Sequence, residues 1–129
     1  MRTRVLVAVC ALAIVACKAK LAGHVTLDGA SFEPTACRSG QALGFSGVEL
    51  SDASGRRLRL ALNVDGTTTA ALFAAGAAKG DNLGACGTLV LQPQDSRINN
   101  VQNMEGTAKL SCKGAGHDLS GELEFANCH

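Results

Sequence analysis

Arg57-Leu58-Arg59-Leu60-Ala61-Leu62 is the clearest strand signal in this chain of 129 residues. Apolar and polar side chains alternate in it, so an extended backbone would place the three leucines on one face and the two arginines on the other. The pattern therefore predicts a β-strand with one face in a core and the other in water.

A partner for this strand precedes it. Residues 47–51 read Gly-Val-Glu-Leu-Ser, and the connecting Asp52-Ala53-Ser54-Gly55 suits a hairpin loop because a glycine can adopt positive φ. In this hairpin Glu49 lies opposite the arginines, as a solvated charge pair worth roughly a few tenths of a kcal/mol.

From Leu21 onward the chain consists of similar short segments separated by Gly, Asp, Asn and Ser, and no long amphipathic helix is evident. A second hairpin is predicted from 106–112 and 119–126, around Lys113-Gly114-Ala115-Gly116-His117-Asp118. Residues 74–87 are interpreted as a long loop, with a short helical turn around 74–78.

Other strands are expected at 23–28, 68–74, 87–92 and 97–103. Together these segments predict an all-β fold, a small antiparallel sandwich or barrel of about eight short strands.

The N-terminus has the pattern of an export signal. Arg2 and Arg4 precede an unbroken apolar run from Val5 to Ala16, which is shorter than the ~20 residues needed to span a bilayer. The run ends in Ile14-Val15-Ala16-Cys17, which resembles the lipobox of bacterial lipoproteins.

This resemblance implies cleavage before Cys17, a diacylglycerol on its sulfur and usually a third acyl chain, such as palmitate, on the new amino group. Two or three chains anchor a protein to a bilayer far more firmly than one. Lys18 stands where an aspartate retains many lipoproteins at the inner membrane, so the resemblance favours the outer membrane, on its periplasmic or surface face.

The alternative is a soluble secreted protein cut by the ordinary signal peptidase. That enzyme prefers small residues one and three positions before the cut, where Ala16 fits and Ile14 does not. A cut after Ala19 would instead place Cys17 at the far position.

The lipoprotein interpretation divides the chain into a cleaved signal at 1–16, a lipidated tether at 17–22 and a single β-domain at 23–129. Without Arg2 and Arg4, acidic and basic residues nearly balance, so charge gives no case for nucleic acid. The chain has no Trp and no Tyr, which argues against an aromatic platform for sugars or bases.

Four cysteines remain when Cys10 in the signal and Cys17 under lipid are set aside, and an even number in an exported domain predicts two disulfides. In the second hairpin Cys112 lies beside the turn and Cys128 at the open end, more than about 20 Å away, whereas a bridge needs Cα atoms within ~7 Å. Pairing of 87–92 with 106–112 favours Cys86–Cys112, which leaves Cys37–Cys128.

No grouping with catalytic or metal-binding spacing is found, so neither a catalytic residue nor a cofactor or metal is predicted. No cysteine pair has the two-residue spacing of redox or zinc motifs. A metal site from His117, Asp118 and His129 is weighed, but the hairpin places His129 at the opposite end. The concentration of Arg56, Arg57 and Arg59 is interpreted as a polar strand face.

These observations predict a membrane-anchored envelope lipoprotein whose disulfide-stabilised β-domain is a binding or structural module and not an enzyme. Its expected partners are the lipid bilayer, through acylated Cys17, and an envelope protein or the cell wall. The alternative function is a small envelope hydrolase or metal-binding protein with a site assembled from distant residues, such as His24, Asp28 and a loop acid.

Overall fold

The computed structural model describes residues 18–42 and 45–128 and confirms the all-β prediction, with ten strands in one antiparallel sheet. The strands are β1 (Lys20–Leu27), β2 (Ala30–Phe32), β3 (Pro34–Ala42), β4 (Phe45–Asp52), β5 (Arg57–Leu62), β6 (Thr68–Phe73), β7 (Asp81–Ala85), β8 (Thr88–Ile98), β9 (Val101–Gly114) and β10 (His117–Ala126). Within these residues, no helix is long and apolar enough to cross a membrane.

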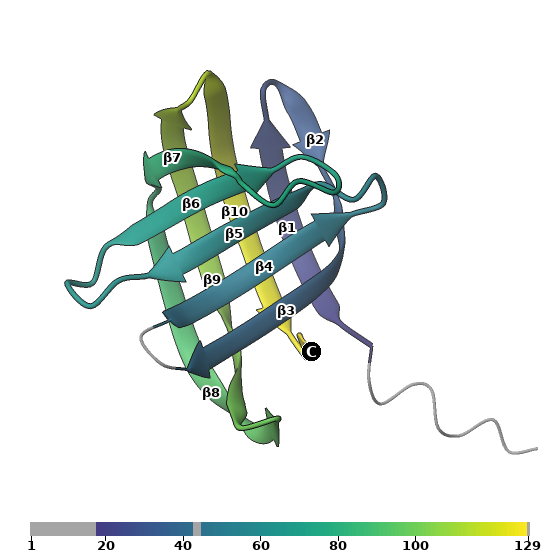
Figure 1. Ribbon diagram of the computed structural model, residues 1–129, viewed down its shortest axis with the longest axis vertical. Helices are drawn as coiled ribbons and strands as arrows, with labels where there is room; N and C mark the ends of the chain where they lie inside the picture. The colour runs from purple at the N-terminus through teal and green to yellow at the C-terminus, as the bar shows by residue number, and fades with distance from the viewer. Residues whose placement is uncertain (1–17, 43–44, 129) are drawn as a thin grey trace, which may run out of the picture.

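The sheet is folded into two layers and is not closed. Its order is β2-β1-β10-β9-β3-β4-β5-β6-β7, and β8 pairs with β9 off this path. Figure 1 shows β3 to β7 as a front layer that crosses the back layer of β1, β10, β9 and β8. Such crossing layers are an orthogonal sandwich, so of the two predicted architectures the open one is found.

Strand β9 belongs to both layers because it is long. Its first half pairs with β8, its second half with β10, and Gln102 near its start pairs with Gln41 of β3. The hydrogen-bonded sheet therefore continues from one layer to the other through β9.

The two predicted hairpins are confirmed. In β4–β5, Leu50 lies opposite Leu58 and Glu49 opposite Arg59. Leu58 and Leu60 are completely buried, whereas Leu62, at the end of the strand, is only partly buried. In β9–β10 the two-residue turn is Ala115-Gly116, both with positive φ, which suits the twist of a tight hairpin.

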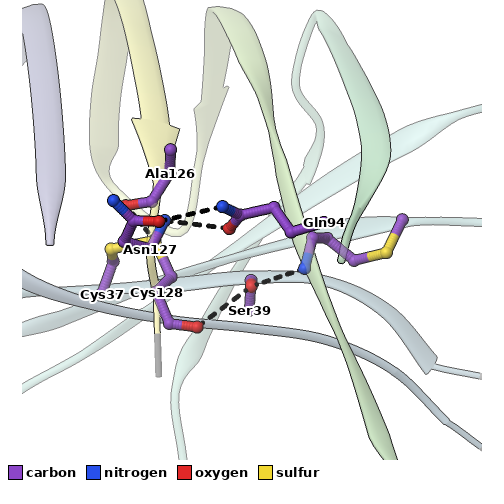
Figure 2. The surroundings of a disulfide bond; sticks show 7 residues. Cys37, Ser39, Gln94, Ala126, Asn127 and Cys128 are labelled. Atoms are coloured by element: carbon purple, nitrogen blue, oxygen red, sulfur yellow. Dashed lines mark hydrogen bonds between the residues drawn. A yellow bond between two sulfur atoms is a disulfide. The ribbon is translucent and has the colours of Figure 1, made fainter. Parts of the chain in front are cut away.

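Both predicted disulfides are present, Cys37–Cys128 and Cys86–Cys112. The first joins β3 in the front layer to the residues after β10 in the back layer, and Figure 2 shows its surroundings. There the Ser39 hydroxyl donates to the Cys128 carbonyl at 3.2 Å and accepts from the Met104 amide at 3.0 Å. The disulfide and this hydrogen-bonded serine hold the two layers together at one end.

The strand count of about eight was wrong, because β2, β3 and β7 were not predicted. β7 lies inside the predicted loop 74–87, and around 74–78 there is one turn, with Ala77 donating to the Ala74 carbonyl at 3.0 Å. The predicted strand 97–103 was also wrong, since the β8–β9 turn interrupts it. Asn99 and Asn100 adopt positive φ there, which asparagine tolerates better than most residues.

Strand β1 begins at Lys20, so the structure pairs Lys20, Leu21 and Ala22 with β10, although they fall in the expected tether 17–22. The proposed lipid site, Cys17, lies outside the described residues.

Candidate functional site

A hollow of about 390 Å³ lies on the outer face of β3, β4 and β5. This volume is near the lower end of the ~300–1,000 Å³ typical of ligand sites. Its lining residues come from these three strands and the start of β9, and they are Arg38, Ser39, Gly40, Phe45, Glu49, Arg59 and Val101. We call it the β3–β5 hollow.

Two facing glycines lie at the hollow, Gly40 in its lining and Gly47 across from it in β4. Gly40 and Gly47 lie opposite each other in the β3–β4 register. A Cβ on Gly47 would lie 2.1 Å from the Leu60 carbonyl oxygen, and one on Gly40 would lie 2.5 Å from a methyl of Val101. Because neither position carries a side chain, Val101 can pack against β3 and the surface stays concave.

Phe45 supplies most of the apolar wall. Its exposed fraction is 41%, whereas Phe32, Phe73 and Phe125 are all at most 7% exposed. One phenylalanine of four is thus left in contact with water beside a concave surface. Phe45 and Val101 together give the hollow an apolar wall, and contiguous apolar surface of this kind is a feature of interaction sites.

Charged side chains form a row beside the aromatic wall, because the register places Arg38, Glu49 and Arg59 opposite one another on three strands. Glu49 accepts hydrogen bonds from Arg59 at 3.1 and 2.9 Å, and Arg57 Nη1 lies 3.6 Å from its other oxygen. The predicted pairing of Glu49 with the arginines is therefore confirmed.

Phe73 packs against Arg57 and Arg59, the two arginines that pair with Glu49. The guanidinium carbons of Arg57 and Arg59 lie 4.6 and 4.7 Å from its ring centroid, as cation–π contacts. Arg56 points elsewhere and pairs with Asp52 at 2.9 Å. Since Arg38 is exposed and has no ion pair among the described residues, its guanidinium is the one at the hollow available to an anion.

A second polar cluster lies at the opposite end of β9, where His117 contacts two carboxylates. Its Nδ1 lies 2.7 Å from Asp28 Oδ2 and its Nε2 lies 3.3 Å from Asp81 Oδ2. Asp28 also accepts the Asp118 amide at 2.8 Å, and its own amide donates to the Asp118 carbonyl at 2.8 Å. The cluster ties the β1–β2 turn, β7 and the β9–β10 hairpin together.

This arrangement shifts two pKa values in opposite directions. The hydrogen bond to Asp28 raises the pKa of His117. Burial, the next largest effect, opposes this rise, and the weaker hydrogen bond to Asp81 adds to it. The same hydrogen bond from His117, with that from the Asp118 amide, lowers the pKa of Asp28. Both shifts favour a charged imidazole between carboxylates, which is a structural clamp.

The alternative site from His24 and Asp28 is not assembled. His24 is exposed on β1 opposite Glu122, and it lies four positions before Asp28 in the chain, or roughly 13 Å away along an extended strand. Asp28 bonds to His117 instead. His129, the third residue of the metal site that we weighed, lies outside the described residues, and the described ones include no group of three His, Cys, Asp or Glu that could hold a metal ion.

Sequence reasoning did not find the β3–β5 hollow. β3 was not predicted, so Arg38 and Gly40 had no assigned neighbours, and Val101 reaches the hollow from far along the chain. The available signal was Gly44-Phe45-Ser46-Gly47, an aromatic residue among glycines where a buried strand would carry more apolar residues.

No protein-family model, no curated protein and no solved structure matches this chain.

Proposed function

We propose that this chain is an envelope lipoprotein, anchored to a bilayer through acylated Cys17, whose β-domain binds a partner protein at the β3–β5 hollow. The lipobox resemblance supports the anchor. The observation that carries the binding role is that the exposed Phe45 ring and the exposed Arg38 side chain line the same hollow, together with Gly40. Aromatic residues and arginine are the residue types enriched at the energetic centres of protein interfaces.

The chemistry of the hollow defines the partner. Phe45 and Val101 offer an apolar wall, and Arg38 can donate two parallel hydrogen bonds to a carboxylate. Arg59 already pairs with Glu49, so these two charges offset each other. Within the described part of the chain, Arg38 is then the unpaired positive charge at the end of the row. The partner is therefore an envelope protein that presents an apolar side chain next to an acidic one.

Site-specific photo-cross-linking in the native host tests the binding role. A photoreactive side chain at position 45 should give one discrete adduct, which the substitution Arg38→Glu abolishes. The matched control is position 64, because Val64 is fully exposed in the β5–β6 loop, away from the hollow. Equal adducts at both positions, or none at 45, would instead favour a structural lipoprotein without a stoichiometric partner.

Intact mass tests the anchor separately. Protein extracted from the host membrane should begin at Cys17, carry two or three acyl groups and gain four protons on reduction of its two disulfides. An unacylated chain that begins elsewhere would refute the lipoprotein assignment and leave the hollow untouched.

A further inference from the structure

The short segment between the proposed anchor and the sheet limits how the domain can sit on a membrane; this inference rests on the proposed lipidation of Cys17. Only Lys18 and Ala19 separate Cys17 from the first residue of β1, Lys20. A fully extended chain advances at most ~3.6 Å per residue, so the Cα atoms of Cys17 and Lys20 are within about 11 Å of each other.

One hairpin extends beyond the start of β1. Lys20 lies opposite Ala126 of β10, and the neighbouring Phe125 lies opposite Gly106 of β9, which places Glu105 at about the level of Lys20. From Glu105, β9 continues back to Val101, four residues or roughly 13 Å further. Figure 1 shows the β8–β9 turn reaching past the ends of β1 and β10.

The overhang is thus at least as long as the tether. If Cys17 is held at the bilayer surface, the hairpin that projects past β1 on the same end of the domain is brought to that surface as well. We call its end, residues 97–101, the β8–β9 tip.

The β8–β9 tip suits the headgroup region of a bilayer. Ile98 is 46% exposed, and the flanking Arg97 donates from Nε to Gln102 at 3.1 Å, which leaves its terminal nitrogens to bind phosphate. Lys18, Lys20 and Arg97 supply positive charge at this end, and the acids there are Asp95 and Glu105 of the same hairpin and Glu124 of β10. An exposed apolar residue next to a guanidinium is typical of surfaces that contact lipid headgroups.

The tip is also held in one shape. Gln102 donates to the Ser96 carbonyl at 3.1 Å and to that of Gln94, and Asn103 donates to the Ser96 hydroxyl at 2.7 Å. A hairpin fixed in this way presents Ile98 without further ordering.

We propose that the β8–β9 tip rests in the headgroup region of the bilayer that holds Cys17, so that the domain is docked in one orientation. The His117 cluster then lies at the far end of β9. The β3–β5 hollow lies near the membrane, since Val101 belongs to both the tip and the hollow. The partner of the hollow would accordingly be a protein of that same membrane.

Tryptophan fluorescence tests this docking directly, because the chain contains no Trp or Tyr. The chain from Cys17 onward keeps every core residue that the structure describes. After its disulfides form, it is coupled through the Cys17 thiol to a maleimide lipid in phosphatidylcholine–phosphatidylglycerol vesicles. Ile98→Trp should shift its emission to shorter wavelength on coupling and lose emission with brominated lipids.

Val64→Trp is the matched control, since this position is fully exposed in a different loop and should keep a water-like spectrum. Water-like emission from both variants, or equal quenching of both, would overturn the fixed orientation. Circular dichroism and thiol counts verify that each variant is folded. Because the tether is made chemically, a failure here is separate from a failure of acylation in the host, which intact mass reports.

Discussion

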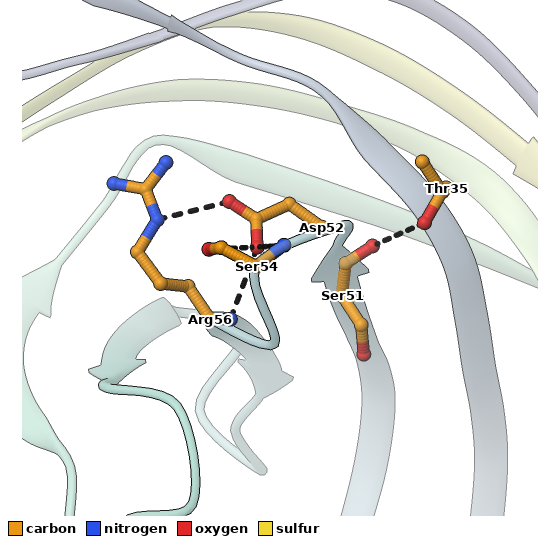
Figure 3. A network of polar contacts seen from close by, with 5 residues as sticks. All are labelled: Thr35, Ser51, Asp52, Ser54 and Arg56. Carbon is orange, nitrogen blue, oxygen red and sulfur yellow. Dashed lines mark hydrogen bonds and ion pairs between the residues drawn. The ribbon is translucent and has the colours of Figure 1, made fainter.

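Asp52 fixes the β4–β5 loop through one carboxylate. As Figure 3 shows, it accepts hydrogen bonds from Ser54 and from both the amide and the side chain of Arg56, at 2.7 to 3.1 Å. Burial raises the pKa of Asp52, but these hydrogen bonds outweigh it and hold the pKa below its ordinary value. The loop thus relies on a charged, hydrogen-bonded carboxylate.

Replacing this residue should therefore destabilise the domain. We expect Asp52→Ala to lower the free energy of unfolding by about 1–2 kcal/mol, measured by urea denaturation, because it leaves donors of Ser54 and Arg56 unpaired. Arg56→Ala should cost less, since the Arg56 side chain is 43% exposed and its ion pair is screened by water. If Arg56→Ala lowered the free energy of unfolding more than Asp52→Ala, the ion pair with Asp52 would contribute more to stability than the hydrogen bonds within the loop.

His117 makes stability depend on pH in a stated direction. Its pKa is raised above 6.5, so its contribution is complete below that pH and is lost as pH rises through the raised value. The pKa of Asp28 is lowered below 3.8, so its contribution is present above that pH and is lost as pH falls through the lowered value. The cluster should stabilise the domain most between about pH 4 and 6.5.

Comparison with His117→Asn isolates this effect. The difference in melting temperature between wild type and variant should be largest within that window and should shrink as pH rises to 8. All other titrating groups are common to the two proteins. If their melting temperatures changed with pH in parallel, the His117 imidazole would not be the source of the pH dependence.

At the scale of elements, hairpins were predictable where local signals agreed. Alternating leucines and the loop residues at Asp52–Gly55 define β4–β5, because both pattern and turn are contained in adjacent residues. β7 reads Asp-Asn-Leu-Gly-Ala and buries only Leu83, so its strand conformation depends on pairing with β6 and not on its own sequence. Context of this kind is invisible in a local pattern.

The β3–β5 hollow was unpredictable for a related reason. Its lining needs Gly40 of β3, which lies opposite Gly47 of β4, and Val101 from the start of β9. The disulfides, in contrast, followed from two local constraints. A hairpin's geometry excludes Cys112 from reaching Cys128, and the predicted pairing of 87–92 with 106–112 favours Cys86–Cys112 over the remaining alternative. Contacts between residues far apart in the sequence can be predicted only where a local element, such as a hairpin, restricts which residues can meet.

The facing glycines Gly40 and Gly47 should differ in their tolerance of a side chain. A Cβ at Gly47 meets the backbone carbonyl of Leu60 in the adjacent strand, whereas a Cβ at Gly40 meets the end of the Val101 side chain, which can move. We expect Gly47→Ala to cost about 1–3 kcal/mol by urea denaturation and Gly40→Ala clearly less. Equal costs would mean that Val101 cannot move aside, and that it is as fixed as the backbone of β5.

Across the whole molecule, two layers with a small aliphatic core depend on covalent links. Both disulfides join the front layer to the back layer: Cys37–Cys128 spans 91 residues, and Cys86–Cys112, between the end of β7 and β9, spans 26 residues. All four cysteines are buried, so replacing either pair with serine adds a comparable burial cost. The difference between the pairs therefore reports mainly the length of the loop that each one closes.

The longer link should accordingly stabilise the domain more. On the chain-entropy model, the two loops correspond to upper values of about 4.6 kcal/mol for Cys37–Cys128 and about 3.5 kcal/mol for Cys86–Cys112. We expect the double variant Cys37→Ser/Cys128→Ser to unfold at lower urea concentration than Cys86→Ser/Cys112→Ser. The reverse order would place the greater constraint at β7, and would mean that layer contacts other than Cys37–Cys128 hold the sandwich together.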